Sequence, residues 1–267
     1  MQLIDTHCHL DFPVFDQDRE ALLARCRALG VTEYIIPAIA EDNWTRVMAL
    51  ADQHADLFYG LGIHPWYAGE QLEGVMERLR TLVMSQPAGL VAIGECGLDL
   101  RSHVPQEGQF ALFEAQIRLA ADAGLPLMIH SVRANDTVAK LLRRFKPPRG
   151  GVIHAFSGSR QQAEAFWQLG FRLGVGGVIS FERANKTREV FRAMPLEALV
   201  LETDSPDMPL QGEQGTRNTP EALPKIAEIL MTLREELSVD VAKVLFETAR
   251  HIFHHDQLPR NKFATPN

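Results

Sequence analysis

Short apolar runs alternate with longer amphipathic stretches along almost the whole chain. The first run begins at Leu3 and leads directly into His7, and seven more follow it. Runs of this length, bounded by glycine or polar residues, indicate buried strands rather than helices. The later strands are predicted over residues 34–39, 57–63, 89–93, 125–129, 151–153, 171–175 and 199–201.

Each predicted strand is followed by a stretch with helical periodicity. Gly30, Gly124 and Gly170 each close such a stretch, as glycine commonly does at the end of a helix. Strands that alternate with helices in this way predict a parallel sheet. Helices are predicted over residues 16–29, 43–54, 72–84, 106–123, 136–145, 161–169, 186–194 and 220–236, with a last one over 239–251.

The number of strand and helix units selects one architecture within the α/β class. Eight units without an evident edge strand favour a closed (β/α)8 TIM barrel over an open doubly wound sheet. The sequence has no GxGxxG or Walker pattern that would indicate a nucleotide-binding fold. A length of 267 residues suits one barrel, which typically takes about 250. We therefore expect residues 1–267 to form a single domain, with a loose polar tail from His255.

The composition indicates in which compartment such a barrel works and how it could bind a charged substrate. No apolar run is long enough to cross a membrane, and the N-terminus lacks the features of a signal peptide. The three cysteines, Cys8, Cys26 and Cys96, show no CxxC spacing, so we expect reduced thiols in the cytoplasm. The net charge of −7 excludes binding of nucleic acid by overall attraction. A nucleic-acid substrate would have to be held locally, by metal ions or a basic patch.

Histidines and acids recur at the predicted ends of the strands. His7 and His9 would point to one face of the first strand, although alone they could equally be polar residues of a surface turn. In a TIM barrel the carboxyl ends of all strands surround one active site. The residues that we expect there are His7, His9, His64, Glu95, His130, His154 and Asp204. Their joint placement predicts a metal site.

The types and number of these residues indicate two metal ions. Apart from His64, the four histidines and two acids exceed the ligands of one tetrahedral ion, so one carboxylate would bridge two ions. Imidazole and carboxylate together suit zinc, manganese, iron or nickel. We expect two divalent ions per chain, with zinc first and manganese, magnesium or nickel as alternatives. Such a pair can hold a hydroxide formed near neutral pH and orient both the attacking and the leaving oxygen.

These residues lie in motifs that resemble the TatD-type metal-dependent hydrolases, a branch of the amidohydrolase superfamily associated with deoxyribonuclease activity. The resemblance covers nearly the whole chain and keeps the motifs in order. They are Asp-Thr-His-Cys-His at 5–9, Gly-Ile-His-Pro at 62–65, Gly-Glu-Cys-Gly-Leu-Asp at 94–99, Ile-His at 129–130 with Arg133, His-Ala-Phe-Ser-Gly at 154–158 and Glu-Thr-Asp-Ser-Pro at 202–206.

The resemblance implies a role for each ligand. It implies a first metal bound by His7, His9, Glu95 and Asp204. It implies a second metal bound by Glu95, His130 and His154, with Glu95 as the bridge. Asp204 would also accept a proton from the attacking water, because a carboxylate bound through one oxygen can use the other as a base. The catalytic residues would then be Asp204 and Glu95.

Several secondary residues have two interpretations. Asp5 could hydrogen-bond the second nitrogen of a histidine ligand, or it could be a buried structural acid. His64 could contact a substrate phosphate or carbonyl, or it could lie on the rim. Arg133 could bind a phosphate or form a surface salt bridge. We expect Cys8 and Cys96 to be packing residues, and the basic run 143–149 to be a solvated turn at the bottom of the barrel.

The chain departs from the family pattern around the expected site. Leu100 to His103 stand where many members have an aromatic pair, and Ala155 and Asp207 replace a cysteine and a tyrosine. We therefore expect a rim poor in the aromatic side chains that bind single strands by stacking. The leading prediction is a dinuclear hydrolase of ester bonds, most of all phosphodiesters in DNA.

Two other functions remain as alternatives. The same metal site could hydrolyse small carboxylic esters, amides or lactones. The barrel could also be a non-catalytic binding module, although a complete ligand set with a candidate base argues against decay of the site. We expect a nucleic-acid or small phosphoester substrate, no membrane association and no obligate protein partner.

Overall fold

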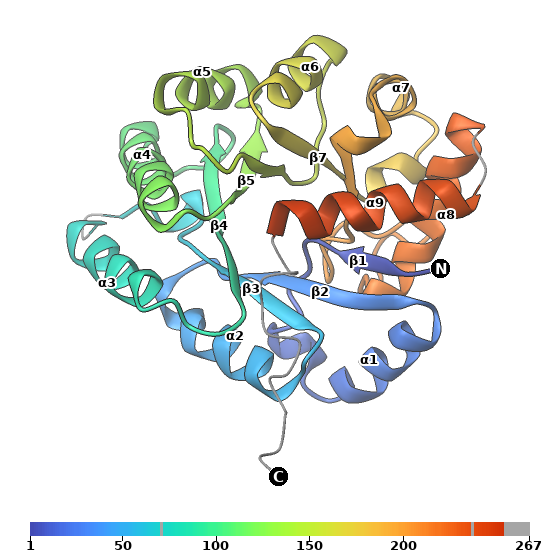
Figure 1. Ribbon diagram of the computed structural model, residues 1–267, viewed down its shortest axis with the longest axis horizontal. Helices are drawn as coiled ribbons and strands as arrows, with labels where there is room; N and C mark the ends of the chain where they lie inside the picture. The colour runs from blue at the N-terminus through green and yellow to red at the C-terminus, as the bar shows by residue number, and fades with distance from the viewer. Residues whose placement is uncertain (70–71, 236–237, 254–267) are drawn as a thin grey trace.

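Eight parallel strands form one sheet, in which each strand pairs with the next along the chain (Figure 1). The computed structural model describes residues 1–69, 72–235 and 238–253. The strands are β1 (Leu3–Asp5), β2 (Val31–Pro37), β3 (Leu57–Leu61), β4 (Leu90–Asp99), β5 (Leu127–Val132), β6 (Gly151–Ile153), β7 (Phe171–Val175) and β8 (Leu199–Leu201).

The first and last strands meet through backbone hydrogen bonds at their carboxyl ends. Thr6 N donates to Leu201 O at 3.0 Å, and Asp204 N donates to His7 O at 2.9 Å. These bonds close the sheet into the predicted (β/α)8 barrel. Because the seam between β1 and β8 is made by the residues that follow both strands, it lies at the level of the predicted ligands His7 and Asp204.

Helices follow the strands and surround them (Figure 1). They are α1 (Arg19–Ala28), α2 (Glu41–Gln53), α3 (Leu72–Met84), α4 (Gln106–Ala123), α5 (Asn135–Phe145), α6 (Arg160–Gln168), α7 (Asn185–Ala193), α8 (Leu223–Arg234) and α9 (Ser238–Phe253). No helix in the described ranges is long and apolar enough to cross a membrane.

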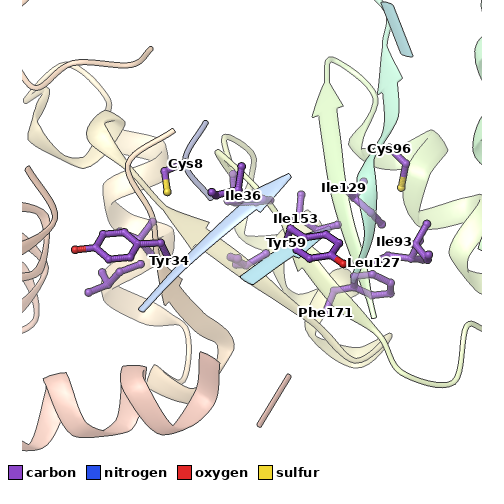
Figure 2. Close-up of a cluster of buried hydrophobic side chains, with 14 of the residues drawn as sticks. Cys8, Tyr34, Ile36, Tyr59, Ile93, Cys96, Leu127, Ile129, Ile153 and Phe171 are labelled. Carbon is purple, nitrogen blue, oxygen red and sulfur yellow. The ribbon is translucent and has the colours of Figure 1, made fainter. Parts of the chain in front are cut away.

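The core has two parts, one outside the barrel and one inside it. The outer part lies between strands and helices and contains Tyr34, Tyr59 and Phe171, which Figure 2 shows with their neighbours. The inner part is a smaller apolar cluster that includes Ile35 and Met128, and residues of α9 pack against it. Helix α9 contacts β1 and β8 and lies across the strands in Figure 1. The amino-terminal end of the barrel is thereby covered, which leaves the opposite end for a site.

Several predicted boundaries were wrong, and two of them affect the site. Strand β4 continues to Asp99 and β5 to Val132, because their backbones stay paired from Cys96 and Ile129 onward. Glu95 and His130 therefore lie within strands instead of following them. Helix α1 starts at Arg19 rather than residue 16, after a 3-10 turn at Pro13–Phe15.

The C-terminal part of the chain needs two more corrections. A 3-10 turn at Pro220–Ala222 precedes α8, and residue 236 of the predicted helix lies outside the described residues. The last helix is longer than expected, since α9 extends from Ser238 to Phe253. The tail predicted from His255 lies outside the described residues.

Candidate metal centre

Glu95 occupies the middle of the predicted ligand set. Its Oε2 atom lies 3.4 Å from His7 Nε2 and 3.7 Å from His9 Nε2. Its Oε1 atom lies 3.0 Å from both His130 Nδ1 and His154 Nε2. The two oxygens of one buried carboxylate thus face two different pairs of imidazoles, one from the end of β1 and one from β5 and the end of β6.

Asp204 completes the group beside the first pair of histidines. Its Oδ1 atom lies 3.6 Å from His7 Nε2 and 3.7 Å from His9 Nε2. The residue has a φ of 57°, in the left-handed region that aspartate tolerates better than most residues. Its side chain is 15% exposed, against 4% for Glu95, so Asp204 is the acid of the group that solvent can reach. The structure therefore brings all six predicted ligands together.

The buried nitrogen atoms of this site fit a divalent cation. Both ring nitrogens of His7, as well as His9 Nδ1 and His154 Nδ1, are buried without a hydrogen-bond partner. Leaving a buried polar atom unsatisfied costs about 1–3 kcal/mol, and coordination of a cation would remove that cost. His7, His9 and Glu95 offer ligand atoms within 4.8 Å of one another, and so do His64, Glu95 and His130. Clusters able to bind metal are therefore present on both sides of Glu95.

The charges of the site keep its two acids in different states. Burial disfavours ionisation of Glu95, but the neighbouring imidazoles of His154 and His64 hold its pKa well below the usual range. Burial raises the pKa of Asp204 to about 7, against the opposing charge of His7. Burial also lowers the pKa of His9 to about 4, which favours the neutral imidazole that a metal needs.

Two acids that sequence reasoning left out also face the histidines. Glu202 is fully buried after β8, and its Oε1 accepts a hydrogen bond from Ala155 N and lies 3.9 Å from His154 Nδ1. Asp99, at the end of β4, has its Oδ2 atom 3.6 Å from His130 Nε2. Asp99 lies in the motif at residues 94–99 and Glu202 in the motif at 202–206. Their position directly at the end of a strand could have identified both as site residues.

His64 and Arg133 lie in the same part of the barrel but at different depths. His64 is only 5% exposed, so it is not a rim histidine, and its Nε2 lies 3.5 Å from Glu95 Oε1. Arg133 is exposed and lines a cavity of about 580 Å3 together with His154 and Asp204. Within the described ranges Arg133 forms no ion pair, which disfavours the salt-bridge interpretation.

The remaining secondary predictions have clear outcomes. Asp5 is a structural acid, because its carboxylate accepts hydrogen bonds from Thr203 N at 3.0 Å and Thr203 Oγ1 at 2.6 Å. Cys8 and Cys96 are packing residues of the core, and Figure 2 shows both. The basic run 143–149 leads from the end of α5 to the start of β6, at the barrel end opposite the metal centre.

The rim is not as poor in aromatic side chains as the sequence predicted. Trp66 and Tyr67 form a 3-10 turn with Pro65 directly after His64, and they are 58% and 49% exposed. The departures at Leu100 and Asp207 replaced aromatic residues of the family pattern, but aromatic side chains reach the rim from the turn after His64.

A (β/α)8 barrel that gathers histidines and carboxylates at the carboxyl ends of its strands is an arrangement suited to metal-dependent hydrolysis. A family model described as TatD related DNase matches residues 4–254. The chain belongs to this family, as its motifs predicted, and it is a metal-dependent hydrolase.

Relatives and solved structures agree with this assignment. The chain is 44% identical to the uncharacterised metal-dependent hydrolase YjjV of Escherichia coli K12, over 95% of this chain and 98% of that protein. It is 33% identical to a protein of Rahnella named 3'-5' ssDNA/RNA exonuclease TatD, over 90% and 93% of the two chains. The crystal structure of YjjV superposes with a TM-score of 0.91 at 45% identity, covering 94% of this chain and 98% of that one.

Proposed function

We propose that this protein is a dinuclear hydrolase that cleaves phosphodiester bonds in DNA. One observation carries the proposal of two ions. The Glu95 oxygens face separate imidazole pairs, with Oε2 beside His7 at 3.4 Å and Oε1 beside His154 at 3.0 Å. A carboxylate that binds one ion does not need its two oxygens beside different imidazole pairs. A carboxylate that bridges two ions does need this.

The ligands divide into two sets around the bridge. His7, His9, Glu95 and Asp204 would hold one ion, while Glu95, His130 and His154 would hold the other. When bound, such ions act as Lewis acids on the ester oxygen and lower the pKa of water to about 7. The several imidazoles favour zinc, although manganese, magnesium or nickel would also suit the set.

Asp204 is the proposed base, because it is the ligand acid with the more exposed side chain and it faces the cavity of about 580 Å3. As the oxygen of a water molecule bonds to phosphorus, the water proton passes to a carboxylate oxygen of Asp204. The bond from phosphorus to the leaving oxygen breaks, and that oxygen then takes up a proton. Arg133 and His64 are the proposed contacts of the phosphate oxygens, Arg133 from the cavity wall and His64 from beside Glu95.

The substrate class is supported by relatives and by the surface of the site. A relative that is 33% identical over 90% of this chain is named a 3'-5' ssDNA/RNA exonuclease. Arg101 and Arg133 line the cavity that contains Asp204, so positive charge is available locally in a chain with a net charge of −7. We further propose that residues 1–267 form one catalytic domain. The protein would work in the cytoplasm, where its three unpaired cysteines would stay reduced.

Metal analysis of the purified protein tests the dinuclear site. We expect about two zinc ions per chain after reconstitution and dialysis, as measured by inductively coupled plasma mass spectrometry. The matched variant is Glu95→Gln, which keeps the side-chain volume but weakens the bridge, and it should retain one ion or fewer. A wild-type content below one ion per chain would overturn the proposal.

The role of Asp204 is tested by Asp204→Asn. This variant should lose at least about 100-fold in kcat, the usual contribution of a general base, while most of the metal stays bound. Activity close to that of the wild type would show that another group accepts the proton.

A substrate panel tests the proposed class. It compares single-stranded DNA, a small phosphodiester, a phosphomonoester and a carboxylic ester at equal enzyme and metal concentration. The highest kcat/KM should belong to DNA. Preference for the carboxylic ester would instead favour the hydrolase of small esters, amides or lactones.

A further inference from the structure

Two aromatic side chains stand at the edge of the metal centre without an assigned role. Trp66 is 58% exposed and Tyr67 is 49% exposed, whereas the other large hydrophobic side chains of comparable exposure in the described ranges are aliphatic. Leaving an indole in water forgoes the stabilisation that its burial would bring. Two adjacent aromatic residues at the mouth of an active site therefore indicate a surface for a ligand.

Trp66 is held in a defined orientation relative to the site. Its Nε1 atom donates a hydrogen bond to Asp99 Oδ2 at 2.7 Å, and its ring packs edge-on against His64 with centroids 4.9 Å apart. Asp99 in turn lies 3.6 Å from His130 Nε2. These side-chain contacts, from Trp66 to Asp99 and from Asp99 to His130, thus fix the plane of the indole relative to a proposed metal ligand.

Helix α4 further immobilises Asp99. The buried side chain of Gln109 accepts a hydrogen bond from Asp99 N at 2.8 Å and donates one to Asp99 O at 3.1 Å. Because the aromatic side chain is already ordered, ligand binding does not cost the conformational entropy of immobilising it. The indole is therefore prepared for stacking before a ligand arrives.

Trp66 forms one wall of a cavity that opens beside the metal centre. This Trp66 cavity has a volume of about 910 Å3, and His103 and Val104 line it as well, while Asp99 and His130 reach it from the strands. The cavity of about 580 Å3 that contains Asp204 and Arg133 shares Arg101, His130 and Val132 with it. One elongated ligand can therefore occupy both cavities at once.

Positive charge lies at the junction of the two cavities. Arg101 is exposed and lines both of them, and within the part of the chain that the structure describes it forms no ion pair. Its guanidinium is free to contact an anionic group located between Trp66 and Asp204. A ligand with an aromatic ring on one side of a phosphate and an ester bond on the other matches this arrangement.

We propose that the Trp66 cavity is a nucleobase subsite, in which the indole of Trp66 stacks on an unpaired base next to the scissile phosphodiester. This inference rests on the proposed function and names the part of the substrate that the site recognises. Bases inside a duplex have both faces covered by their neighbours, so the subsite selects single strands or frayed ends. Stacking depends on the π-face of a base, which all four bases have, and not on the pattern of its hydrogen-bonding groups. The subsite therefore accepts all four bases.

The test uses the metal-loaded enzyme and two oligothymidylate strands that differ in one residue. One strand is intact, and the other carries an abasic tetrahydrofuran residue, placed in turn at each position near the cleaved bond. At one position the wild type should lose about 10- to 100-fold in kcat/KM for the abasic strand, the range that base stacking on an aromatic side chain supplies. Equal rates at every position would overturn the proposal.

Variants separate stacking from a structural role. Trp66→Ala should remove the discrimination, so that the ratio of kcat/KM for the intact strand to that for the abasic strand falls close to one. Trp66→Phe should restore most of the difference. Leu29→Ala, which alters a residue of 49% exposure at the end of α1, is the matched control and should behave as the wild type. If Trp66→Ala slows both strands equally, Trp66 is a structural residue.

Failure of this inference can be told apart from failure of the proposed function. Cleavage of DNA without discrimination against the abasic strand overturns only the subsite. If the enzyme cleaves no phosphodiester, the proposed function fails, and the subsite is then judged by fluorescence anisotropy of the same two labelled strands. A weaker affinity for the abasic strand in the wild type, absent in Trp66→Ala, supports the subsite, whereas equal affinities overturn it.

Discussion

Asp5 joins the segments that follow the first and last strands, β1 and β8, with one carboxylate. Its Oδ1 atom accepts hydrogen bonds from Thr203 N at 3.0 Å and His7 N at 3.3 Å, and its Oδ2 atom accepts one from Thr203 Oγ1 at 2.6 Å. Because His7 follows β1 and Thr203 follows β8, these bonds fix the segments that carry His7 and Asp204 relative to each other. Asp5 therefore positions ligands of the metal centre although it contacts no imidazole nitrogen.

Removing this carboxylate should destabilise the protein. Asp5→Ala leaves the buried Thr203 N and His7 N without an acceptor and removes one acceptor of the Thr203 hydroxyl, so we expect a loss of roughly 2–4 kcal/mol in the free energy of unfolding. Asp5→Asn keeps one oxygen acceptor and can donate to the Thr203 hydroxyl, so its loss should be about 1 kcal/mol. Urea denaturation of both variants provides the measurement. Equal losses would show that volume rather than hydrogen bonding matters at this position.

At the scale of elements, helix α4 organises two loops of the site from outside the barrel. Gln109 and Gln116 are seven residues apart, so they lie two turns apart on the same face of the helix. Gln116 binds Ile63 N and Ile63 O at 2.8 and 2.9 Å, next to His64. Gln109 binds both backbone groups of Asp99 and also Val104 O. Each buried amide binds backbone groups at or just after the carboxyl end of a strand, Gln109 at the end of β4 and Gln116 after β3.

We expect Gln109→Leu to loosen the end of β4, which carries Asp99, and the loop that follows it. Three backbone groups lose their partner, which should cost roughly 2–4 kcal/mol in the free energy of unfolding. KM for single-stranded DNA should rise more than kcat falls, because Asp99 orients Trp66 rather than the reacting atoms. Gln106→Leu, at an exposed position of the same helix, is the control for added hydrophobicity. A stability unchanged from the wild type would contradict this role.

At the scale of the whole molecule, one end of the barrel is closed and the other is open and reactive. Helix α9 packs against the inner apolar cluster near the amino ends of the strands. The opposite end gathers buried imidazoles, and several of their nitrogens, both of those of His7 among them, lack hydrogen-bond partners. A metal therefore acts on stability as well as on activity, since it binds the folded barrel and not the separated strands.

Removal of metal should lower the melting temperature. A ligand present at about 100 times its Kd stabilises the folded state by about 2.7 kcal/mol, which corresponds to roughly 5 °C for a chain of this size. Differential scanning calorimetry before and after dialysis against EDTA measures the shift, and added zinc should reverse it. A variant with both His7→Ala and His9→Ala should respond less. An unchanged melting temperature together with complete loss of metal would contradict the coupling.

The overall charge predicts a weak dependence of DNA binding on salt. With a net charge of −7, attraction must come from the exposed arginines of the site, Arg101 and Arg133. Two phosphate contacts on a single strand correspond to a slope of about −1.4 in a plot of log K against log salt concentration. Arg101→Ala should make the slope shallower by about 0.7. A slope steeper than about −4 would indicate a wider basic surface and contradict this account.

The sequence by itself determined the architecture and the composition of the site. Apolar runs alternating with helical stretches predict a parallel barrel because local hydrophobic periodicity reports which residues are buried. Once the barrel is assumed, His7, His130 and His154 must converge, since the carboxyl ends of all its strands surround one axis. Neither step requires knowledge of a single side-chain contact.

Only the tertiary structure decided which atoms meet. The division of the Glu95 oxygens between two imidazole pairs depends on how far β4 continues beyond Ile93, and its apolar run ended there. The bonds of Asp5 to Thr203 join residues almost 200 positions apart. The position of Trp66 beside Asp99 depends on the path of a loop, and no hydrophobic periodicity in the sequence predicts that path. Contacts between distant segments arise from the packing of the closed barrel, and a local pattern carries no information about them.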